Sequence, residues 1–337
     1  VNVLALTFGD ESCASSQYRI FQYRNELARR GIELEAQPAN EFSDWRALAD
    51  YDAVIIQKRL FSGRVVRRLR RGARRLIYDV DDAIWLPHGR SHHPFTRWRT
   101  ERRLKAVCAA ADLCLAANGL LNAKLADFSK NAQVLPMALD PKIWTRGDRS
   151  DREGLRVGWN GYPANLCYLE AIEDDLIRLL KTHDNVEIQV LCGARPAFKQ
   201  GLKYTYIPFA PGRDSEAVRG FDIGLLPLPV DAFAAHKSPI KALQYMASGV
   251  VTVASPVGAT LDLIEENRGG VFASKPGEWL SALDRLIVDA ELRTRIGDAA
   301  RKRFEDMFSL DATATELARL LTGLTETAPN RHNHSLT

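Results

Sequence analysis

Residues that could do chemistry gather at the segment 79–93 of this 337-residue sequence. Three carboxylates and three histidines occur there: Asp79, Asp81, Asp82, His88, His92 and His93. Such a set can bind a divalent metal through its oxygens, take part in catalysis or acceptor binding, or only cap a helix and pair with nearby arginines. All three interpretations stay open, and the second is favoured.

A second reactive stretch, residues 236–258, reads HKSPIKALQYMASGVVTVASPVG. Lys237 precedes Ser238, which can cap a helix, and Pro239, which suits a first helical position. Because a helix N-terminus carries partial positive charge, a lysine beside it predicts an anionic ligand. The alternative is an ordinary helix–strand unit with a solvated lysine.

The loop from Gly158 to Asn165 is a weaker candidate. It follows an apolar strand pattern and leads into a helical one, so its backbone N–H groups suit a phosphate or a sugar hydroxyl. Its glycines alone have little specificity.

The elements that position these residues alternate between strand and helix patterns along the chain. Short apolar runs such as DAVIIQ and RLIYDV predict buried parallel strands, and the carboxyl ends of such strands face the ligand crevice. This pattern predicts an α/β protein with two Rossmann-like domains. The predicted parts are an N-terminal domain (1–150), a C-terminal domain (151–310), a helix that packs back toward the first domain (311–325) and a disordered tail (326–337).

Composition limits the class of protein. The chain is 46% hydrophobic and 26% charged, as is usual for a globular protein. No apolar run reaches the roughly 20 residues that cross a bilayer, and the opening VNVLALTF lacks a basic segment before it, so we expect a first strand and not a signal peptide. Five cysteines without a CxxC pair predict reduced thiols in a cytoplasmic protein and argue against zinc.

The net charge of +4 is unevenly distributed. Residues 1–150 hold 25 Lys and Arg against 17 Asp and Glu, whereas the remainder holds 21 against 25. The segment RVVRRLRRGARR (64–75) predicts a helix with seven arginines, which could dock on an anionic membrane or form a solvated helix surface. Nucleic-acid binding is not favoured, because few aromatic residues interleave the arginines and no nucleic-acid motif occurs.

Residues 237–258 also resemble the C-terminal signature of the retaining family-4 glycosyltransferases. SSQYRIFQYRNELARRGIE and LIYDVDDAIW in the first half resemble N-terminal motifs of the same family. The resemblance implies the GT-B architecture, in which two Rossmann-like domains face each other across a cleft. It also implies transfer of a sugar from a nucleoside diphosphate-sugar to an acceptor hydroxyl, with retention and without a metal or other cofactor.

The resemblance places the donor on the second domain, with the ribose at Gln244 and the diphosphate at Lys237. Two departures stand out. His236 and Gln244 occupy the positions of the family's paired glutamates, and the neutral GYPANL replaces its Arg and Lys diphosphate pair. The predicted donor-binding residues are Gly161, Asn165, Phe209, Lys237, Ser238, Lys241, Gln244 and Gly258.

The acceptor is expected on the first domain, at Ser16, Arg19 and His92, with Asp81 and Asp82 as catalytic residues. The implied acceptor is a glycan, a lipid-linked sugar or another hydroxyl compound in surface polysaccharide or glycolipid synthesis. Peripheral contact with the inner membrane face is a further expectation. The alternatives are a GT-B protein that binds nucleotides without turnover and serves as a scaffold, and a less favoured nucleotide-sugar epimerase.

Overall fold

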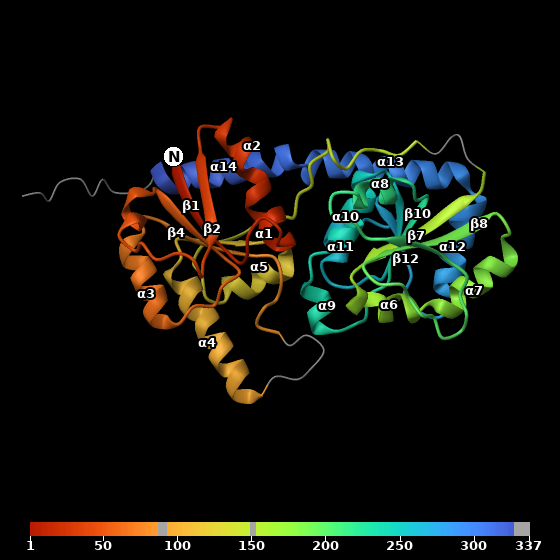
Figure 1. The fold of residues 1–337 in the computed structure, drawn as a ribbon, viewed down its shortest axis with the longest axis horizontal. Coiled ribbons are helices and arrows are strands. Elements are labelled where there is room, and N and C mark those ends of the chain that lie inside the picture. The colour runs from red at the N-terminus through yellow and green to blue at the C-terminus, as the bar shows by residue number, and fades with distance from the viewer. Residues whose placement is uncertain (87–92, 149–152, 327–337) are drawn as a thin grey trace, which may run out of the picture. The chain divides into compact units, whose positions relative to one another are not determined.

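The computed structural model describes residues 1–86, 93–148 and 153–326, which divide into two compact domains. Domain 1 contains residues 1–138 and the chain from Leu310 onward, and domain 2 contains Leu139–Ser309. Each domain is a parallel six-stranded sheet with helices packed on it (Figure 1), so the predicted α/β class is confirmed. Among the residues described, no helix is both long and apolar enough to cross a lipid bilayer.

The sheet of domain 1 has the strand order β2-β1-β3-β4-β5-β6. The chain leaves β1 for β2 on one side and continues from β3 onward on the other, so the order reverses between β1 and β3. The elements are β1 (Asn2–Thr7), α1 (Ala14–Arg19), η1 (Phe21–Tyr23), α2 (Arg24–Ala28), β2 (Glu33–Pro38), η2 (Ala47–Asp50), β3 (Ala53–Gln57), α3 (Gly63–Gly72), β4 (Leu76–Val80), α4 (Pro94–Ala110), β5 (Leu113–Ala116), α5 (Gly119–Ala126), β6 (Ala132–Val134) and α14 (Leu310–Glu326).

Domain 2 has the order β12-β11-β10-β7-β8-β9, which reverses between β7 and β10. Such reversals leave a crevice at the carboxyl ends of the two strands, where doubly wound sheets bind ligands. The elements are β7 (Leu155–Gly161), η3 (Pro163–Asn165), α6 (Leu166–Glu170), α7 (Glu173–Thr182), β8 (Val186–Cys192), β9 (Thr205–Pro208), α8 (Asp214–Arg219), β10 (Ile223–Leu226), α9 (Ala232–His236), α10 (Ile240–Ala247), β11 (Val251–Ala254), α11 (Thr260–Leu263), β12 (Gly270–Phe272), α12 (Glu278–Val288) and α13 (Ala290–Met307).

The helix α10 packs closely against the centre of the domain 2 sheet. Its Tyr245 ring lies directly over Gly224 of β10, where an added Cβ would come within 2.5 Å of the ring. The Tyr245 hydroxyl accepts a hydrogen bond from the Asn160 backbone N–H (3.1 Å) and donates one to the Leu225 carbonyl (3.2 Å). This contact joins the last turn of α10 to both strands that flank the reversal, β7 and β10.

Three local features of the structure are not evident from the sequence. Residues 18–30 do not form one continuous helix, because the Ile20 backbone leaves the helical region (φ −129°, ψ −64°) between α1 and η1. Pro239 takes the N-cap position of α10, so Ser238 lies just outside the helix and does not cap it. An additional helix, α9, precedes this stretch, and the Asp231 carboxylate caps it by accepting from the Ala234 N–H (2.7 Å).

The domain boundary lies earlier than the predicted residue 150. Residues after Leu139 pack within domain 2, where Trp144 is buried and its carbonyl accepts from the Arg301 guanidinium at 2.7 Å. Arg146 forms an ion pair with Asp298 of α13. These contacts assign residues 139–148 to the second domain.

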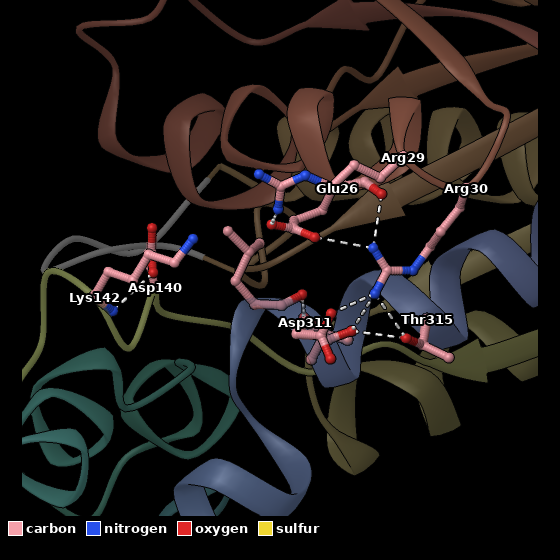
Figure 2. Close-up of polar contacts among 9 residues, drawn as sticks. Glu26, Arg29, Arg30, Asp140, Lys142, Asp311 and Thr315 are labelled. Carbon is pink, nitrogen blue, oxygen red and sulfur yellow. Dashed lines mark hydrogen bonds and ion pairs between the residues drawn. The ribbon is translucent and has the colours of Figure 1, made fainter.

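The C-terminal helix α14 packs on domain 1. Its Leu317 and Leu321 are buried in the same apolar core as Leu27 of α2. The Tyr23 hydroxyl donates to the Thr313 hydroxyl at 3.1 Å. At the surface, Arg30 lies between Glu26 on one side and α14 on the other, where it contacts Asp311 and Thr315 (Figure 2).

Candidate active site

The predicted catalytic carboxylates lie at the carboxyl end of the domain 1 sheet, directly after β4. Lys58 follows the neighbouring strand β3, and its Nζ lies 3.0 Å from Asp81 Oδ1 and 2.7 Å from Asp82 Oδ2. The Ser15 hydroxyl donates to Asp81 Oδ2 at 2.6 Å. Burial alone would lower the pKa of Lys58, but the two carboxylates raise it above its ordinary value, so the ammonium stays charged. Sequence reasoning missed Lys58.

Asp79 is fully committed to a buried ion pair with Arg19. Arg19 Nε donates to Asp79 Oδ2 (3.1 Å), and its Nη1 donates to the Leu135 carbonyl (2.7 Å). The side chain of Arg19 has no exposed surface. Arg19, which the sequence places on the acceptor surface, is instead enclosed, because its charge compensates the buried Asp79 carboxylate.

A hydrogen-bonded glutamine, Gln57, lies at the strand reversal of domain 1. Gln57 Oε1 accepts from the Phe8 N–H (2.9 Å) and from the Ser16 hydroxyl (3.0 Å), and the Ser16 oxygen accepts from the Gly9 N–H (3.0 Å). The predicted acceptor residue Ser16 is therefore buried and engaged within the domain. Its hydrogen bonds hold the start of α1, which also carries Ser15.

The histidines of this segment are only partly described. His88 and His92 lie outside the described residues. His93 caps α4, where its Nδ1 accepts from the Phe95 N–H at 3.3 Å. Within the described part of the chain, no group of three metal-ligating side chains lies close enough to hold an ion.

A pocket opens at the strand reversal of domain 2, between the carboxyl ends of β7 and β10 and the start of α10. It encloses about 560 Å³ of empty space, part of it open to solvent. Apolar and aromatic side chains form most of its walls. The lining residues are Trp159, Asn160, Gly161, Tyr162, Asn165, Tyr168, Leu226, Pro227, Leu228, Lys237, Ser238, Pro239, Ile240 and Lys241.

Two lysines give this pocket its charge. Burial, together with the nearby positive charge of Lys237, lowers the pKa of Lys241 to about 8, against an opposing effect of Asp214. No carboxylate pairs with Lys241 at salt-bridge distance among the residues described. An anion that enters the pocket would supply the missing countercharge, so the arrangement favours a ligand with phosphate groups.

Five of the eight predicted donor-binding residues line the pocket: Gly161, Asn165, Lys237, Ser238 and Lys241. The other three do not. Gln244, the predicted ribose contact, is 1% exposed, and its Oε1 accepts from Asn160 Nδ2 at 2.8 Å. Phe209 is 43% exposed after β9, and Gly258 has φ 52° with the Ala235 carbonyl so close that a Cβ would lie 2.0 Å from it.

The two positions where the resemblance implies glutamates, Gln244 and His236, both make contacts within domain 2. Gln244 orients Asn160, which itself lines the pocket. His236 ends α9, and its Nδ1 lies 2.7 Å from the Ala232 carbonyl. Sequence reasoning missed the aromatic walls, namely Trp159, Tyr162 and Tyr168, although the string WNGYPANLCY directly after a strand was a signal for them.

Part of domain 2 matches a known protein family. A family model described as glycosyl transferase-like matches residues 177–319, which include Lys237, Lys241 and all of α10. No curated protein matches the chain by sequence.

Solved structures share the fold across both domains. Sucrose-phosphate synthase (tll1590) from Thermosynechococcus elongatus has a TM-score of 0.73 at 14% identity, over 96% of this chain and 99% of that one. HepE from Anabaena, in complex with UDP, has a TM-score of 0.63 at 14% identity, over 96% and 100%. The apo form of the lipopolysaccharide outer core galactosyltransferase WaaB has a TM-score of 0.65 at 12% identity, over 96% and 100%. These matches confirm the predicted GT-B fold.

Proposed function

From the premise that this chain carries a glycosyl transferase-like domain on a GT-B fold, we propose that it transfers a sugar from a nucleoside diphosphate-sugar to an acceptor hydroxyl. The observation that carries this proposal is the domain 2 pocket, because it joins two lysines to aromatic walls at a strand reversal. The lysines suit a diphosphate and the aromatic rings suit a base or a sugar.

In this proposal the diphosphate lies against Lys237, Lys241 and the backbone after β7. When the bond between the anomeric carbon and the diphosphate oxygen breaks, negative charge grows on the leaving diphosphate. Fixed ammonium groups stabilise that charge, with roughly 1.5–3 kcal/mol for each charge-assisted hydrogen bond. The transfer therefore proceeds, in our proposal, without a metal or other cofactor, and the family resemblance implies retention at the anomeric carbon.

We assign the acceptor to domain 1, with Asp81 as the group that orients or deprotonates its hydroxyl. Asp81 is held from two sides, by Lys58 (3.0 Å) and by Ser15 (2.6 Å), so its carboxylate has a fixed direction. A positioned carboxylate is suited to accept a proton as the new bond to the acceptor oxygen forms. A glycan or lipid-linked acceptor, and peripheral contact with a membrane, complete the proposal.

The test is a binding screen with UDP, GDP, ADP and TDP by thermal shift, followed by transfer assays with the matching nucleotide sugars. UDP comes first, because structures of HepE with UDP and with UDP-glucose share this fold. One nucleotide should raise the melting temperature. Lys241→Met should weaken its binding about tenfold or more, since a charge-assisted contact is lost. Lys181→Met, on an exposed turn of α7, is the matched control.

The outcomes distinguish the proposed transfer reaction from the scaffold and epimerase alternatives. Nucleotide binding followed by transfer to any hydroxyl acceptor supports the proposal. Binding with no transfer to any acceptor in the panel favours the scaffold alternative, and a changed sugar nucleotide without added acceptor favours an epimerase. If no nucleotide binds, or if Lys241→Met behaves like the control, the pocket assignment fails.

A further inference from the structure

The helix α4 of domain 1 is covered only along its second half. Its buried side chains are Leu104, Val107 and Cys108. None of the ten residues from Pro94 to Arg103 is buried, and this part of the helix extends beyond the sheet that its second half covers (Figure 1). The side chains in the first half of α4 are therefore accessible at the surface of domain 1.

The outward side of α4 combines aromatic and cationic side chains. Phe95, Trp98, Arg99, Arg102 and Lys105 recur at intervals of three and four residues, so they lie along one side of the helix. That side is opposite the buried Leu104. Phe95 is 60% exposed and Trp98 is 54% exposed. We call these five residues the α4 outer face.

The members of the α4 outer face also contact one another. The rings of Phe95 and Trp98 have centroids 5.7 Å apart, and the Arg102 guanidinium lies 5.2 Å from the Trp98 ring centre. The one carboxylate in this half of the helix, Glu101, lies 3.3 Å from Lys124 Nζ of α5. The outer face is therefore positive, with two neighbouring aromatic rings at the exposed end of the helix.

We infer that the α4 outer face docks on the surface of a lipid bilayer that contains anionic lipids. Aromatic rings with a polar neighbour settle at the boundary between headgroups and acyl chains, while Arg and Lys pair with anionic headgroups. A helix with both features along one side, and an apolar anchor to the protein on the other, has the arrangement of an interfacial helix. Charge complementarity thus selects an anionic membrane as the partner.

The arginine-rich helix α3 does not fit this role equally well. Two of its arginines and the two that follow it are already engaged: Arg70 and Arg75 with Asp112, Arg74 with Asp52, and Arg68 over the Trp45 ring. Arg64, Arg67 and Arg71 stay exposed without an ion pair to any described residue, but α3 carries no aromatic side chain. It can add positive charge near α4 but supplies no group that enters the lipid.

The α4 outer face is the surface for the peripheral membrane contact in the proposed function. Its docking on a bilayer does not depend on sugar transfer. Vesicle binding is measured without donor or acceptor. Vesicle binding can therefore be absent while sugar transfer is observed, and vesicle binding can be observed without sugar transfer.

The test is co-sedimentation of the full chain with vesicles of phosphatidylcholine alone and of phosphatidylcholine with one quarter phosphatidylglycerol. We expect binding to the anionic vesicles only, and its loss at 0.5 M NaCl because salt screens the charges. Arg99→Gln with Arg102→Gln should weaken binding roughly 25-fold, since each cation near such a surface contributes about fivefold. Phe95→Ser with Trp98→Ser should weaken it at least tenfold.

Two matched controls separate the α4 outer face from its surroundings. Val288→Ser removes an exposed apolar side chain of domain 2, and Arg64→Gln with Arg71→Gln removes two exposed charges of α3. The Val288 control should bind as the unchanged chain does, and the α3 pair should lose less than the α4 pair. Equal binding to both vesicle types, a larger loss in the α3 pair, or binding to single-stranded RNA but not to vesicles would each overturn the inference.

Discussion

Both sheets reverse their strand order, but the side chains at the carboxyl ends of the strands differ between the two domains. In domain 1, Gln57 and Ser16 are hydrogen-bonded to each other at the reversal between β1 and β3, and Asp81 and Asp82 beside it are paired with Lys58. In domain 2 the reversal between β7 and β10 stays open, and Lys241 there has a lowered pKa. In domain 1 the charged side chains pair with one another, whereas in domain 2 the Lys241 ammonium lines a pocket.

This difference separates two tasks. A pre-paired carboxylate such as Asp81 is held rigidly, which suits the orientation of a neutral hydroxyl. A pocket lined by two lysines suits an anion such as a diphosphate. Strand topology alone would make the two edges equivalent, so the difference in task comes from which side chains follow the strands. The following predictions test this contrast, from the largest expected effect to the smallest.

The largest effect is expected in domain 1, where Arg19→Met leaves the Asp79 carboxylate buried without its partner. Removal of one member of a buried ion pair typically costs about 3–5 kcal/mol of the free energy of unfolding. Urea denaturation of the variant measures this loss. The control is Arg24→Met, which breaks the exposed pair with Glu11 and should cost at most about 1 kcal/mol. Equal losses in both variants would show that the Arg19 pair is not a structural requirement.

Asp81→Asn should lower the transfer rate about 100-fold, because an amide cannot accept the acceptor proton. Nucleotide affinity should stay unchanged, because the nucleotide belongs to domain 2. Initial rates and nucleotide titrations measure the two quantities separately, with Asp127→Asn on the exposed end of α5 as the control. A parallel loss of nucleotide affinity would break the division of tasks between the two edges.

A smaller effect follows from the lowered pKa of Lys241 at the open edge. In the free protein this lysine loses its proton as the pH rises through about 8, whereas a bound diphosphate raises its pKa again. Nucleoside diphosphate affinity should therefore be constant below pH 7 and fall by up to about tenfold per pH unit above pH 8. Calorimetric titration from pH 6.5 to 9.5 measures the profile. Lys241→Met should flatten it, and an unchanged slope in that variant would assign the titration to another group.

The smallest effect is expected at the surface contact of α14. Arg30→Ala removes the bridge from Glu26 to Asp311 (Figure 2), which is partly exposed and therefore worth at most about 1 kcal/mol. Thermal unfolding should change only slightly. Because α14 is held mainly by buried leucines, Leu321→Ala is the contrasting variant and should cost about 2–5 kcal/mol. A larger loss in Arg30→Ala than in Leu321→Ala would contradict this assignment.

Much of the fold could be predicted because its signals are local. Apolar runs such as LIYDV and VVTVA predict β4 and β11. The break at Ile20 was not predictable, since it depends on how the two short helices pack on the sheet. The early domain boundary likewise depends on the distant partner of Trp144, which is Arg301.

Site residues could be predicted where one segment of the chain carries them. They could not be predicted where the order of the strands in the sheet brings distant residues together. Lys237, Ser238 and Lys241 lie together because they begin one helix. Lys58 meets Asp81 only because β3 and β4 are neighbours, and no spacing along the chain reveals that. Gln244 faces inward to Asn160 because of the rotation of α10, which Tyr245 fixes against the sheet.

The most direct test of the central claim is a crystal structure of the chain with the nucleoside diphosphate that stabilises it most. The account predicts density for the diphosphate in the domain 2 pocket, with an oxygen within 3.5 Å of Lys237 or Lys241 Nζ and the base against the aromatic walls. Domain 1 should keep Lys58 paired with Asp81 and Asp82. A nucleotide bound outside this pocket, or bound there without contact to either lysine, would contradict the account.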